Sequence, residues 1–447
     1  MKIKVMKFGG TSVRSPESRM QAALRVISAR EQGYMPVVVV SAIGRRGEPY
    51  ATDTLINMLA EIDPNVAPDQ RELDLLMACG EILSSVVFAH LLKTQGHTAM
   101  AMRGGQAGIR TDGVYGNARI LAVNPLGLFE ALKRGHIPVV CGFQGVWVQG
   151  GLPGAELTTL GRGGSDTTAT AVAAALKADS VEIFTDVDGL KTADPDYVPD
   201  APTLSKVSYD EVAELAYLGA KVLHPRAAEI AMRFGVPLWI KNTFSEHPGT
   251  QVVSREEFPG TRVTGVSHTG KLVHIQFNLS AIKDGQRHTF QARIYEMLAQ
   301  EGTSLHMVDL SAESIGFAVP REQFPRVEDL FDGLVLPVAK DHIYVVRRED
   351  KHSHAADTQI KLMADMVDVV AVPYTVTEGT TMVSLVGHEY MQQPGVFESV
   401  MRTLQENKVP VMQVSDSDFS LSCLIPESEL KKAVVALHDR FVSEVAH

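Results

Sequence analysis

The first half of the chain alternates between short apolar runs and longer helical patterns, and this alternation constrains the fold more than any other feature. The run "MPVVVVSA" at 35–42 is continuously apolar, as expected of a strand that is buried on both faces of a sheet. Further strands are predicted at "IKVMKF", "HIPVVCGFQGV", "SVEIFTDVDGL" and "VPLWIKN", with helices over 16–32, 53–61, 70–93 and 225–234. We therefore predict an α/β fold with a mostly parallel sheet between two layers of helices, in which ligands bind beyond the carboxyl ends of the strands.

The composition excludes several classes of protein. A formal net charge of −11 argues against a nucleic-acid-binding protein, which needs a basic surface. The three cysteines, Cys79, Cys141 and Cys423, form no CxxC pair, so we expect buried thiols in a reducing compartment rather than a zinc site or disulfides. The N-terminus has the pattern of a strand rather than a signal peptide, and no apolar run approaches membrane-spanning length, so a cytoplasmic location is expected.

The second half of the chain contains an internal repeat. When Leu298 is aligned with Leu404, "MLAQEGTSLHMVDLSAESIGFAVPREQF" runs without gaps against "TLQENKVPVMQVSDSDFSLSCLIPESEL", and Pro320 falls on Pro426. The apolar positions agree although few residues are identical. We predict two copies of a small α+β unit with the order helix, strand, strand, helix.

These patterns divide the chain into five predicted segments. A first domain covers 1–245, a polar linker 246–263, a first small domain 264–335, a connecting insertion 336–380 and a second small domain 381–447. The insertion contains the polar stretch "VVRREDKHSHAADTQ", whose two histidines we expect in a solvated loop rather than at a metal ion.

The stretch "LTTLGRGGSDTTATAVAAAL" at 157–176 is the most informative one for function. Its glycines predict a tight turn into the N-terminus of a Thr/Ala-rich helix, where backbone N–H groups favour an anion. Arg162 could hold a carboxylate or phosphate through two hydrogen bonds, and Ser165 or Asp166 could cap the helix. Taken alone, a turn and a capped helix explain the stretch equally well.

The stretch "KFGGTS" at 7–12 is a second loop of this kind. Lys7 lies at the end of the first predicted strand beside two glycines, which suits it to neutralise a transferring phosphoryl group. The alternative is a surface lysine next to a turn. Two such loops on one sheet favour a phosphate-handling enzyme. A near-match to a P-loop at "GVSHTGKL" lacks the Ser/Thr that would hold magnesium and precedes a strand, so we reject it.

Together, "KFGGTS", "TTLGRGGSDTTA", "FTDVDGLKTADP" and "GAKVLHPRA" resemble the aspartokinase family of the amino-acid kinase superfamily, in order and spacing, over about the first 245 residues. The paired repeats resemble the ACT regulatory domains of the same enzymes. The resemblance implies an amino-acid kinase fold followed by two ACT-type domains. It implies ATP-dependent phosphorylation of the side-chain carboxylate of L-aspartate, the first step toward lysine, threonine and methionine, in a feedback-regulated homodimer or larger homo-oligomer.

The resemblance also implies roles for individual residues. Lys7, Arg162 and Asp166 would be the catalytic residues, with Asp166 orienting Lys7 or the substrate. Glu81 would bind the substrate ammonium, whereas by itself it is better explained as a polar residue on a helix. The implied ATP-binding residues are Lys7, Phe8, Gly9, Gly10, Ser41, Thr185, Asp186, Thr192, Asp194, Pro195 and Lys221, and the implied aspartate-binding residues are Ser41, Thr52, Glu81, Arg162, Gly163, Gly164 and Ser165.

The implied reaction needs no general base. The nucleophile would be a carboxylate with a reference pKa of about 3.9, which is already ionised at neutral pH. Catalysis must then come from holding two anions in line and neutralising their repulsion. Mg²⁺ would be carried by the ATP phosphates and water, because the sequence offers no dedicated acidic metal cage, although Asp186 could contribute.

The implied effector is an amino acid such as lysine, threonine or diaminopimelate, bound at an interface between ACT copies. The effector residues would be His306, Asp309 and Ser311, with His306 standing where the family often has an aspartate. The loop "NLSAIKDGQRH" also lacks the usual Asp-x-Pro-Gly turn, whereas "YMQQPGVFE" keeps its Pro-Gly pair. The alternative is that the repeats serve only for assembly.

Three other functions compete with this hypothesis. A kinase for another small acid, such as glutamate or carbamate, is opposed by the ACT-like pair and by Thr52, Asp53 and Glu81. A non-catalytic amino-acid sensor with a degenerate kinase domain is opposed by the presence of Lys7 and Arg162. A nucleotide-binding structural protein explains neither the substrate-side residues nor the repeats.

Overall fold

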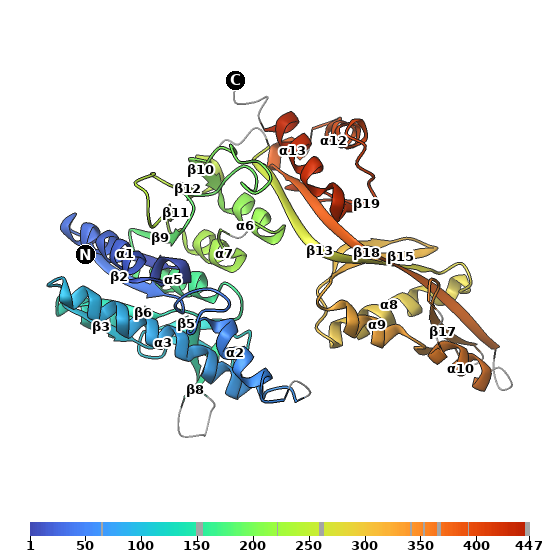
Figure 1. Cartoon of the computed structure of the whole chain (residues 1–447), viewed down its shortest axis with the longest axis horizontal. Coiled ribbons are helices and arrows are strands. Elements are labelled where there is room, and N and C mark those ends of the chain that lie inside the picture. Colours follow the sequence, from blue (N-terminus) through green and yellow to red (C-terminus); the bar gives the residue numbers. More distant parts are fainter. Residues whose placement is uncertain are drawn as a thin grey trace. The chain divides into compact units, whose positions relative to one another are not determined.

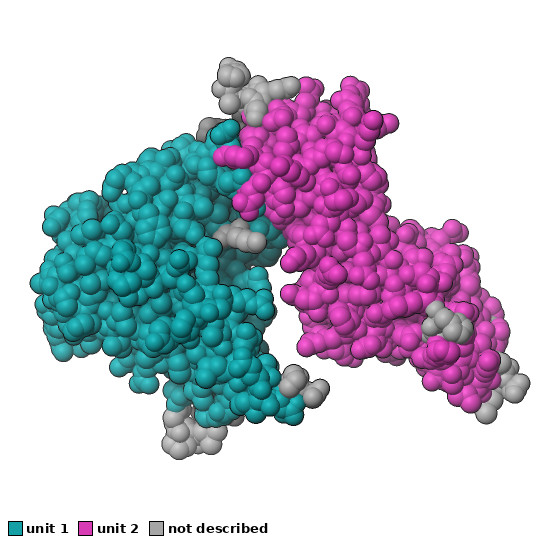
Figure 2. All heavy atoms as spheres, in the orientation of Figure 1, with its two compact units in different colours: residues 1–195, 200–264 teal, residues 196–199, 265–447 magenta. Residues whose placement is uncertain are grey.

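The computed structural model describes residues 1–63, 66–148, 155–220, 222–258, 263–339, 342–351, 354–363, 368–391 and 393–442. The chain divides into two compact units, which Figure 2 shows in teal and magenta. Met1–Pro195 and Asp200–Thr264 form the first, here called the N-terminal unit, and Asp196–Pro199 and Gly265–His447 form the second, the C-terminal unit.

An eight-stranded sheet forms the centre of the N-terminal unit, in the order β10-β12-β11-β9-β1-β2-β6-β3. Its strands are β1 (Ile3–Phe8), β2 (Met35–Val40), β3 (Ala99–Met102), β6 (Ile137–Cys141), β9 (Ser180–Thr185), β10 (Lys206–Ser208), β11 (Leu238–Asn242) and β12 (Thr250–Val253). Every neighbouring pair runs parallel except β11 and β12. The prediction of a mostly parallel α/β sheet is therefore confirmed.

Side chains along β1 alternate between the two faces of this sheet. Met6 and Phe8 pack with α1 (Pro16–Glu31) and α3 (Gln70–Thr94) in one core. Lys7 points to the opposite face, where α5 (Gly164–Leu176) begins. The remaining helices of the unit are α2 (Thr52–Ala60), α4 (Leu126–Lys133), α6 (Tyr209–Tyr217) and α7 (Pro225–Phe234). Strand periodicity thus places Lys7 beside the N-terminus of α5, and Figure 1 shows the helices of this unit.

A second, four-stranded sheet belongs to the same unit. Its order is β5 (Ile120–Val123), β4 (Ile109–Thr111), β7 (Gln144–Trp147) and β8 (Glu156–Thr159). The stretch "HIPVVCGFQGV", predicted as one strand, is divided between β6 and β7 in different sheets. Phe143 turns the chain between them with a φ of 68°, a value uncommon for a residue other than glycine. The single-strand prediction was wrong because nothing in the sequence marks a positive φ at phenylalanine.

The segment predicted as a linker, 246–263, is partly built into the main sheet. β12 pairs antiparallel with β11 and parallel with β10. The compact unit continues to Thr264, whose hydroxyl donates a hydrogen bond of 2.6 Å to the buried Glu211. The polar residues around β12 concealed this short strand.

The helix α3 is long and apolar enough to cross a membrane by length and composition, contrary to the expectation that no such run exists. Half of its most apolar window is buried inside the protein, as in the core helix of a folded domain. Cys79 on this helix is exposed, so the expectation of buried thiols holds only for Cys141 and Cys423. Burial raises the pKa of Cys141 to about 11, which makes this thiol unreactive at neutral pH.

Two long strands, β13 (Gly265–Asn278) and β18 (Asp368–Val386), run side by side through the C-terminal unit and pair antiparallel (Figure 1). The first repeat adds β14 (His306–Leu310) and β15 (Ser314–Pro320), with α8 (Asp284–Gln300) and α9 (Phe324–Phe331). The second adds β19 (Gln413–Asp416) and β20 (Ser420–Pro426), with α12 (Val396–Glu406) and α13 (Leu430–Phe441). β15 and β20 begin and end at aligned residues, which confirms the predicted pair of α+β units.

Residues 336–380 do not form a separate connecting insertion. β16 (Val335–Ala339) and β17 (His342–Arg348) extend the sheet from β18, and Tyr344 and Val346 are buried in the core of the first repeat. α10 (His354–Met363) begins within the stretch expected to be a solvated loop, and His352 lies outside the described residues. The many charged residues of this stretch hid the alternation of β17.

Candidate active site

A pocket of about 630 Å³ lies beyond the carboxyl ends of β1 and β2, at the N-terminus of α5. It gathers residues from segments that are far apart in the sequence. The predicted site residues that line it are Lys7, Gly10, Ser41, Thr52, Glu81, Arg162, Gly163, Gly164, Ser165 and Asp166. All the residues expected to be catalytic and all those expected to bind aspartate therefore share one pocket.

Lys7 and Asp166 form an ion pair in the wall of this pocket. Lys7 Nζ lies 2.6 Å from Asp166 Oδ1, and each side chain is only 12% exposed. Partial exclusion of water strengthens such an interaction relative to a surface pair. Because Asp166 lies in the first turn of α5, the pair joins the central strand to the helix and holds the ammonium group at the pocket.

The turn before α5 depends on glycine. Gly161 and Gly163 have φ values of 72° and 69°, and a Cβ on Gly163 would lie 2.1 Å from the ring of His224. Gly163 is the N-cap of α5, and no side chain caps the helix. The expectation that Ser165 or Asp166 forms the cap was therefore wrong. Within this turn the Gly164 N–H donates to the Gly161 carbonyl and the Asp166 N–H to the Gly163 carbonyl, so the favourable environment for an anion comes mainly from the positive end of the helix dipole at the pocket.

Glu81 is a buried carboxylate on α3, only 3% exposed. The Ala42 backbone N–H donates to its Oε1 at 2.9 Å, whereas Oε2 has no hydrogen-bond partner among the described residues. Burial raises the pKa of Glu81 to about 8. A buried carboxylate with an unused oxygen at a pocket wall is suited to a cation, so the structure favours a ligand-binding role over a plain helix position.

Most residues expected at the nucleotide lie outside the lining of this pocket. Phe8 is fully buried and stacks on Phe184 in the core, so its side chain is unavailable to a ligand. The Gly9 N–H donates to the Phe184 carbonyl, and Asp186 pairs with Arg45 at 2.5 Å just beyond the end of β9. The others are Thr185 at the end of β9 and Thr192, Asp194 and Pro195 in the following loop, while Lys221 lies outside the described residues.

Several lining residues were missed by the sequence analysis: Ala42, Gly44, Met77, Gly116, Phe143 and Gly161. Met77 could have been found, because it precedes Glu81 by one helical turn and so shares its face of α3. Gly116 comes from the turn between β4 and β5 of the small sheet, and Phe143 from the turn that leads from β6 of the main sheet to β7 of the small sheet. No local pattern predicts that these turns reach the pocket.

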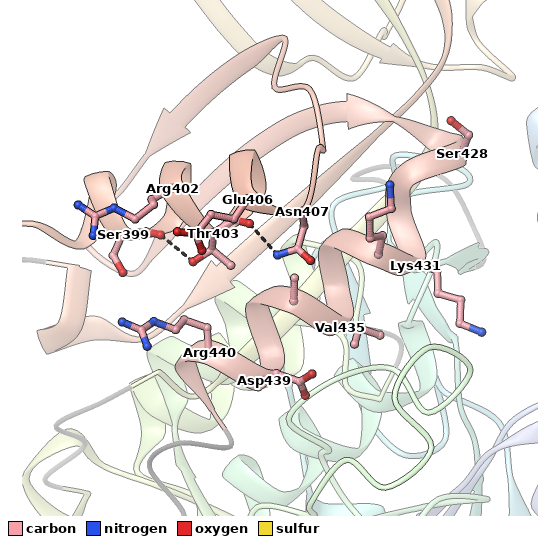
Figure 3. A pocket seen from close by; sticks show the side chains of 12 residues that line it. Ser399, Arg402, Thr403, Glu406, Asn407, Ser428, Lys431, Val435, Asp439 and Arg440 are labelled. Carbon is pink, nitrogen blue, oxygen red and sulfur yellow. Dashed lines mark hydrogen bonds between the residues drawn. The ribbon is translucent and has the colours of Figure 1, made fainter.

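A larger hollow of about 840 Å³ lies between α12 and α13 in the C-terminal unit (Figure 3). Arg402 pairs with Glu398 along α12, and Lys432 of α13 pairs with Glu429, which directly precedes that helix. Within α12, the Thr403 hydroxyl donates to the Ser399 carbonyl. No predicted site residue lines this hollow. Arg402, Thr403, Asn407 and Lys432 have partners close by in the sequence. We therefore place the chemistry in the smaller pocket of the N-terminal unit.

The residues expected at an effector lie along β14 and the turn after it. His306 is half-buried, and burial lowers its pKa, whereas Asp309 and Ser311 are exposed. Gln413 Nε2, on β19 of the second repeat, donates a hydrogen bond to the Met307 carbonyl. The strand β14, which carries His306 and Asp309, therefore contacts the second repeat, whereas Ser311 bonds to Ser314 within its own turn.

Comparison with known proteins gives consistent results. The model of the Amino acid kinase family matches residues 2–242, and that of the ACT domain matches residues 383–441. Aspartokinase 1 of Bacillus subtilis (strain 168) is 37% identical over 447 residues, 99% of each chain. The aspartokinase of Mycolicibacterium smegmatis is 35% identical over 444 residues, 99% of this chain and 96% of the relative.

The fold also resembles solved structures along its whole length. The structure of E. coli aspartokinase III in complex with aspartate and ADP superimposes with a TM-score of 0.72 at 23% identity, covering 98% of this chain and 99% of that one. The same enzyme in complex with lysine and aspartate gives a TM-score of 0.67 at 22% identity, covering 99% of this chain and 100% of that one. The family model over residues 2–242 and the full-length relatives show that the chain belongs to the aspartokinase family.

Proposed function

We propose that this protein phosphorylates the side-chain carboxylate of L-aspartate with ATP, giving 4-phospho-L-aspartate. The observation that carries the proposal is one pocket with two kinds of charge. The Lys7–Asp166 pair and the uncapped N-terminus of α5 suit a phosphoryl group, whereas Glu81 and Arg162 suit the ammonium and carboxylate of an amino acid. The E. coli aspartokinase III structure that shares this fold is a complex with both aspartate and ADP.

The reaction follows from this arrangement of charges. A side-chain oxygen of aspartate attacks the γ-phosphorus, the new O–P bond forms, and the bond to the leaving ADP breaks. Lys7 neutralises charge on the transferring group, and Asp166 keeps the Lys7 ammonium in place. Arg162 fixes a carboxylate and Glu81 the ammonium, which holds the nucleophile in line. No proton has to be removed, because the carboxylate is ionised at neutral pH.

The nucleotide would lie at the end of β9, beside Thr185, Asp186 and the loop with Thr192, Asp194 and Pro195, with Ser41 toward the phosphates. Lys221, outside the described residues, would bind the phosphates as the family resemblance implies. Among the described residues no three His, Cys, Asp or Glu side chains gather as a metal site. Because Asp166 is paired with Lys7 and Asp186 with Arg45, Mg²⁺ would be held mainly by the phosphates and water. When bound, Mg²⁺ would neutralise charge on those phosphates.

The C-terminal unit would regulate the enzyme. We propose an amino-acid effector at His306, Asp309 and Ser311, with lysine, threonine and diaminopimelate as the candidates, because β14 contacts β19 of the second repeat. The C-terminal unit would also join copies of the chain in a homodimer or larger homo-oligomer. We also propose a cytoplasmic location.

Trapping the product with hydroxylamine tests the proposal. Purified protein is mixed with Mg-ATP and L-aspartate, with L-glutamate and no-acid reactions as controls. We expect aspartate-dependent hydroxamate, and titration with the three candidate effectors should identify the one that changes its rate. Hydroxamate with glutamate instead of aspartate would indicate a kinase for another acid, and folded protein without any product would indicate a sensor.

A further inference from the structure

Asp74 is a fully buried carboxylate on α3 that the mechanism above does not use. Three donors satisfy it. Thr159 donates both its hydroxyl, at 2.6 Å to Oδ1, and its backbone N–H, at 2.8 Å to Oδ2. The Gly116 backbone N–H donates to the same carboxylate at 3.0 Å. Burial of a charged group is costly, so three charge-assisted hydrogen bonds fix both partner segments firmly to the helix.

These partners lie directly next to the pocket. Thr159 is the last residue of β8, three residues before Arg162, and Gly116 lines the pocket itself. The two segments also bond to each other, because the Ala118 N–H donates to the Thr159 carbonyl at 2.8 Å. A Cβ on Gly161 would lie 3.1 Å from the Gly116 carbonyl oxygen, so the chain entering Arg162 packs closely against this loop.

A second contact, on the solvent side, holds the same two segments, 115–118 and 159–162, which are here called the corner. Arg226, on α7, donates through Nη1 to the Leu160 carbonyl at 3.1 Å and through Nη2 to Asn117 Oδ1 at 2.8 Å. Arg226 is partly exposed, whereas Asp74 is buried under the corner. The buried carboxylate is thus the inner anchor of the turn that presents Arg162.

We propose that Asp74 is a positioning residue for aspartate, which acts by tying β8 and the loop at 115–118 together beneath Arg162. This inference rests on the proposed function, in which Arg162 holds a substrate carboxylate. On the same face of α3, Met77 and Glu81 line the pocket one and two turns further on. One face of α3 therefore carries both Glu81, which binds the substrate ammonium, and Asp74, which positions Arg162 for the substrate carboxylate.

The test compares Michaelis constants in the full-length enzyme. Asp74→Asn keeps the size of the side chain but replaces one acceptor oxygen with a donor that faces other donors. We expect KM for aspartate to rise about tenfold or more, because a displaced Arg162 would bind the substrate carboxylate poorly. KM for ATP should stay within about twofold. Leu92→Ala, a buried change on the same helix away from the corner, is the stability control.

Milder variants keep the test valid if Asp74→Asn fails to fold. Thr159→Val keeps the branched shape and removes only the hydroxyl donor, whereas Thr159→Ser retains it. We expect Thr159→Val to raise KM for aspartate by about threefold, and Thr159→Ser to raise it less, because one charge-assisted hydrogen bond of the network is lost.

Two results would overturn the inference. The first is that Asp74→Asn and Leu92→Ala lower the thermal midpoint by the same amount and raise KM for aspartate and KM for ATP to the same extent. Such a result would mean a general loss of stability. The other is an unchanged KM for aspartate in Thr159→Val. Either result with an active wild type leaves the proposed function intact, whereas a wild type that forms no aspartyl hydroxamate refutes the proposed function itself.

Discussion

The pocket of the N-terminal unit and the hollow between α12 and α13 are both lined by charged side chains, but they hold these charges differently. Lys7 and Asp166 are each 12% exposed, and Glu81 is buried with one oxygen unused. Arg402 and Glu398 at the hollow are 65% and 58% exposed and pair along one helix. Burial and anchoring to the backbone, rather than the size of the cavity, thus distinguish a reactive site from a solvated surface.

Of the substitutions considered in the two regions, the removal of the Lys7 ammonium should have the largest effect on activity. We expect Lys7→Ala to lower kcat by about a thousandfold, because the transferring phosphoryl group loses its positioned positive charge. Steady-state kinetics with both substrates saturating would measure this. Asp166→Asn is the matched variant, which should lower kcat less because Lys7 itself remains. Equal rates for Lys7→Ala and wild type would contradict the assigned role.

Glu81 should make the binding of aspartate depend on pH. Its raised pKa of about 8 means that the free protein carries a protonated Glu81 at pH 7, whereas a substrate ammonium favours the ionised form. Binding of aspartate should therefore tighten as the pH rises toward 8, with KM falling up to about tenfold per pH unit. Glu81→Gln should raise KM by about a hundredfold and remove this dependence. A pH-independent KM in the wild type would refute the prediction.

The same carboxyl group also predicts a trend in stability. The unfolded chain loses this proton near the ordinary value of 4.5, whereas the folded chain retains it up to about pH 8. Between these values the native state binds more protons, so this group's contribution to stability falls as the pH rises. Thermal melts from pH 5 to pH 8 should show a steeper decline for the wild type than for Glu81→Gln. Parallel curves would argue against a protonated Glu81.

Two glycines at helix N-termini provide a matched pair across the units. Gly163 and Gly395 both have positive φ, at 69° and 90°, but a Cβ on Gly163 meets the His224 ring and one on Gly395 meets nothing within 4 Å. Gly395→Ala should cost only about 1 kcal/mol of backbone strain. Gly163→Ala should cost about 2 to 4 kcal/mol because a clash is added to the strain. Chemical denaturation measures both, and equal losses would show that His224 gives way freely.

The smallest effect is expected at the hollow. Arg402→Ala should change stability by less than about 0.5 kcal/mol, because its ion pair with Glu398 is exposed. Basal activity should stay within about twofold of wild type, since no site residue lies there. A large loss of basal activity would contradict the contrast drawn between the two regions.

The strands and loops that carry their own local signal were predictable from the sequence. The apolar run of β2, the glycines before α5 and the repeat that aligns β15 with β20 each determine local structure through burial, positive φ or periodicity. The order and spacing of the motifs resemble those of a known family, and this resemblance assigned Lys7 and Arg162 to one site. Both residues line the same pocket in the structure.

The missed features depend on contacts between distant segments. β12 is a short strand in a polar stretch and is recognisable only through its partners β10 and β11. Phe143 adopts a positive φ because it turns the chain from one sheet to another. Asp74 looks like an ordinary polar residue on a helix, and its importance appears only when Thr159 and Gly116 fold over it. Pairing and packing of this kind leave no local pattern.

The most direct test of the account follows the oxygen atoms of the substrate. L-Aspartate labelled with ¹⁸O in its side-chain carboxylate is converted in the presence of Mg-ATP and hydroxylamine, and the released phosphate is analysed by mass. Hydroxylamine breaks the C–O bond of the acyl phosphate, so the account predicts one ¹⁸O atom in each phosphate released with hydroxamate. Phosphate without label would mean that water, and not the aspartate carboxylate, attacks ATP in this pocket, and would contradict the account.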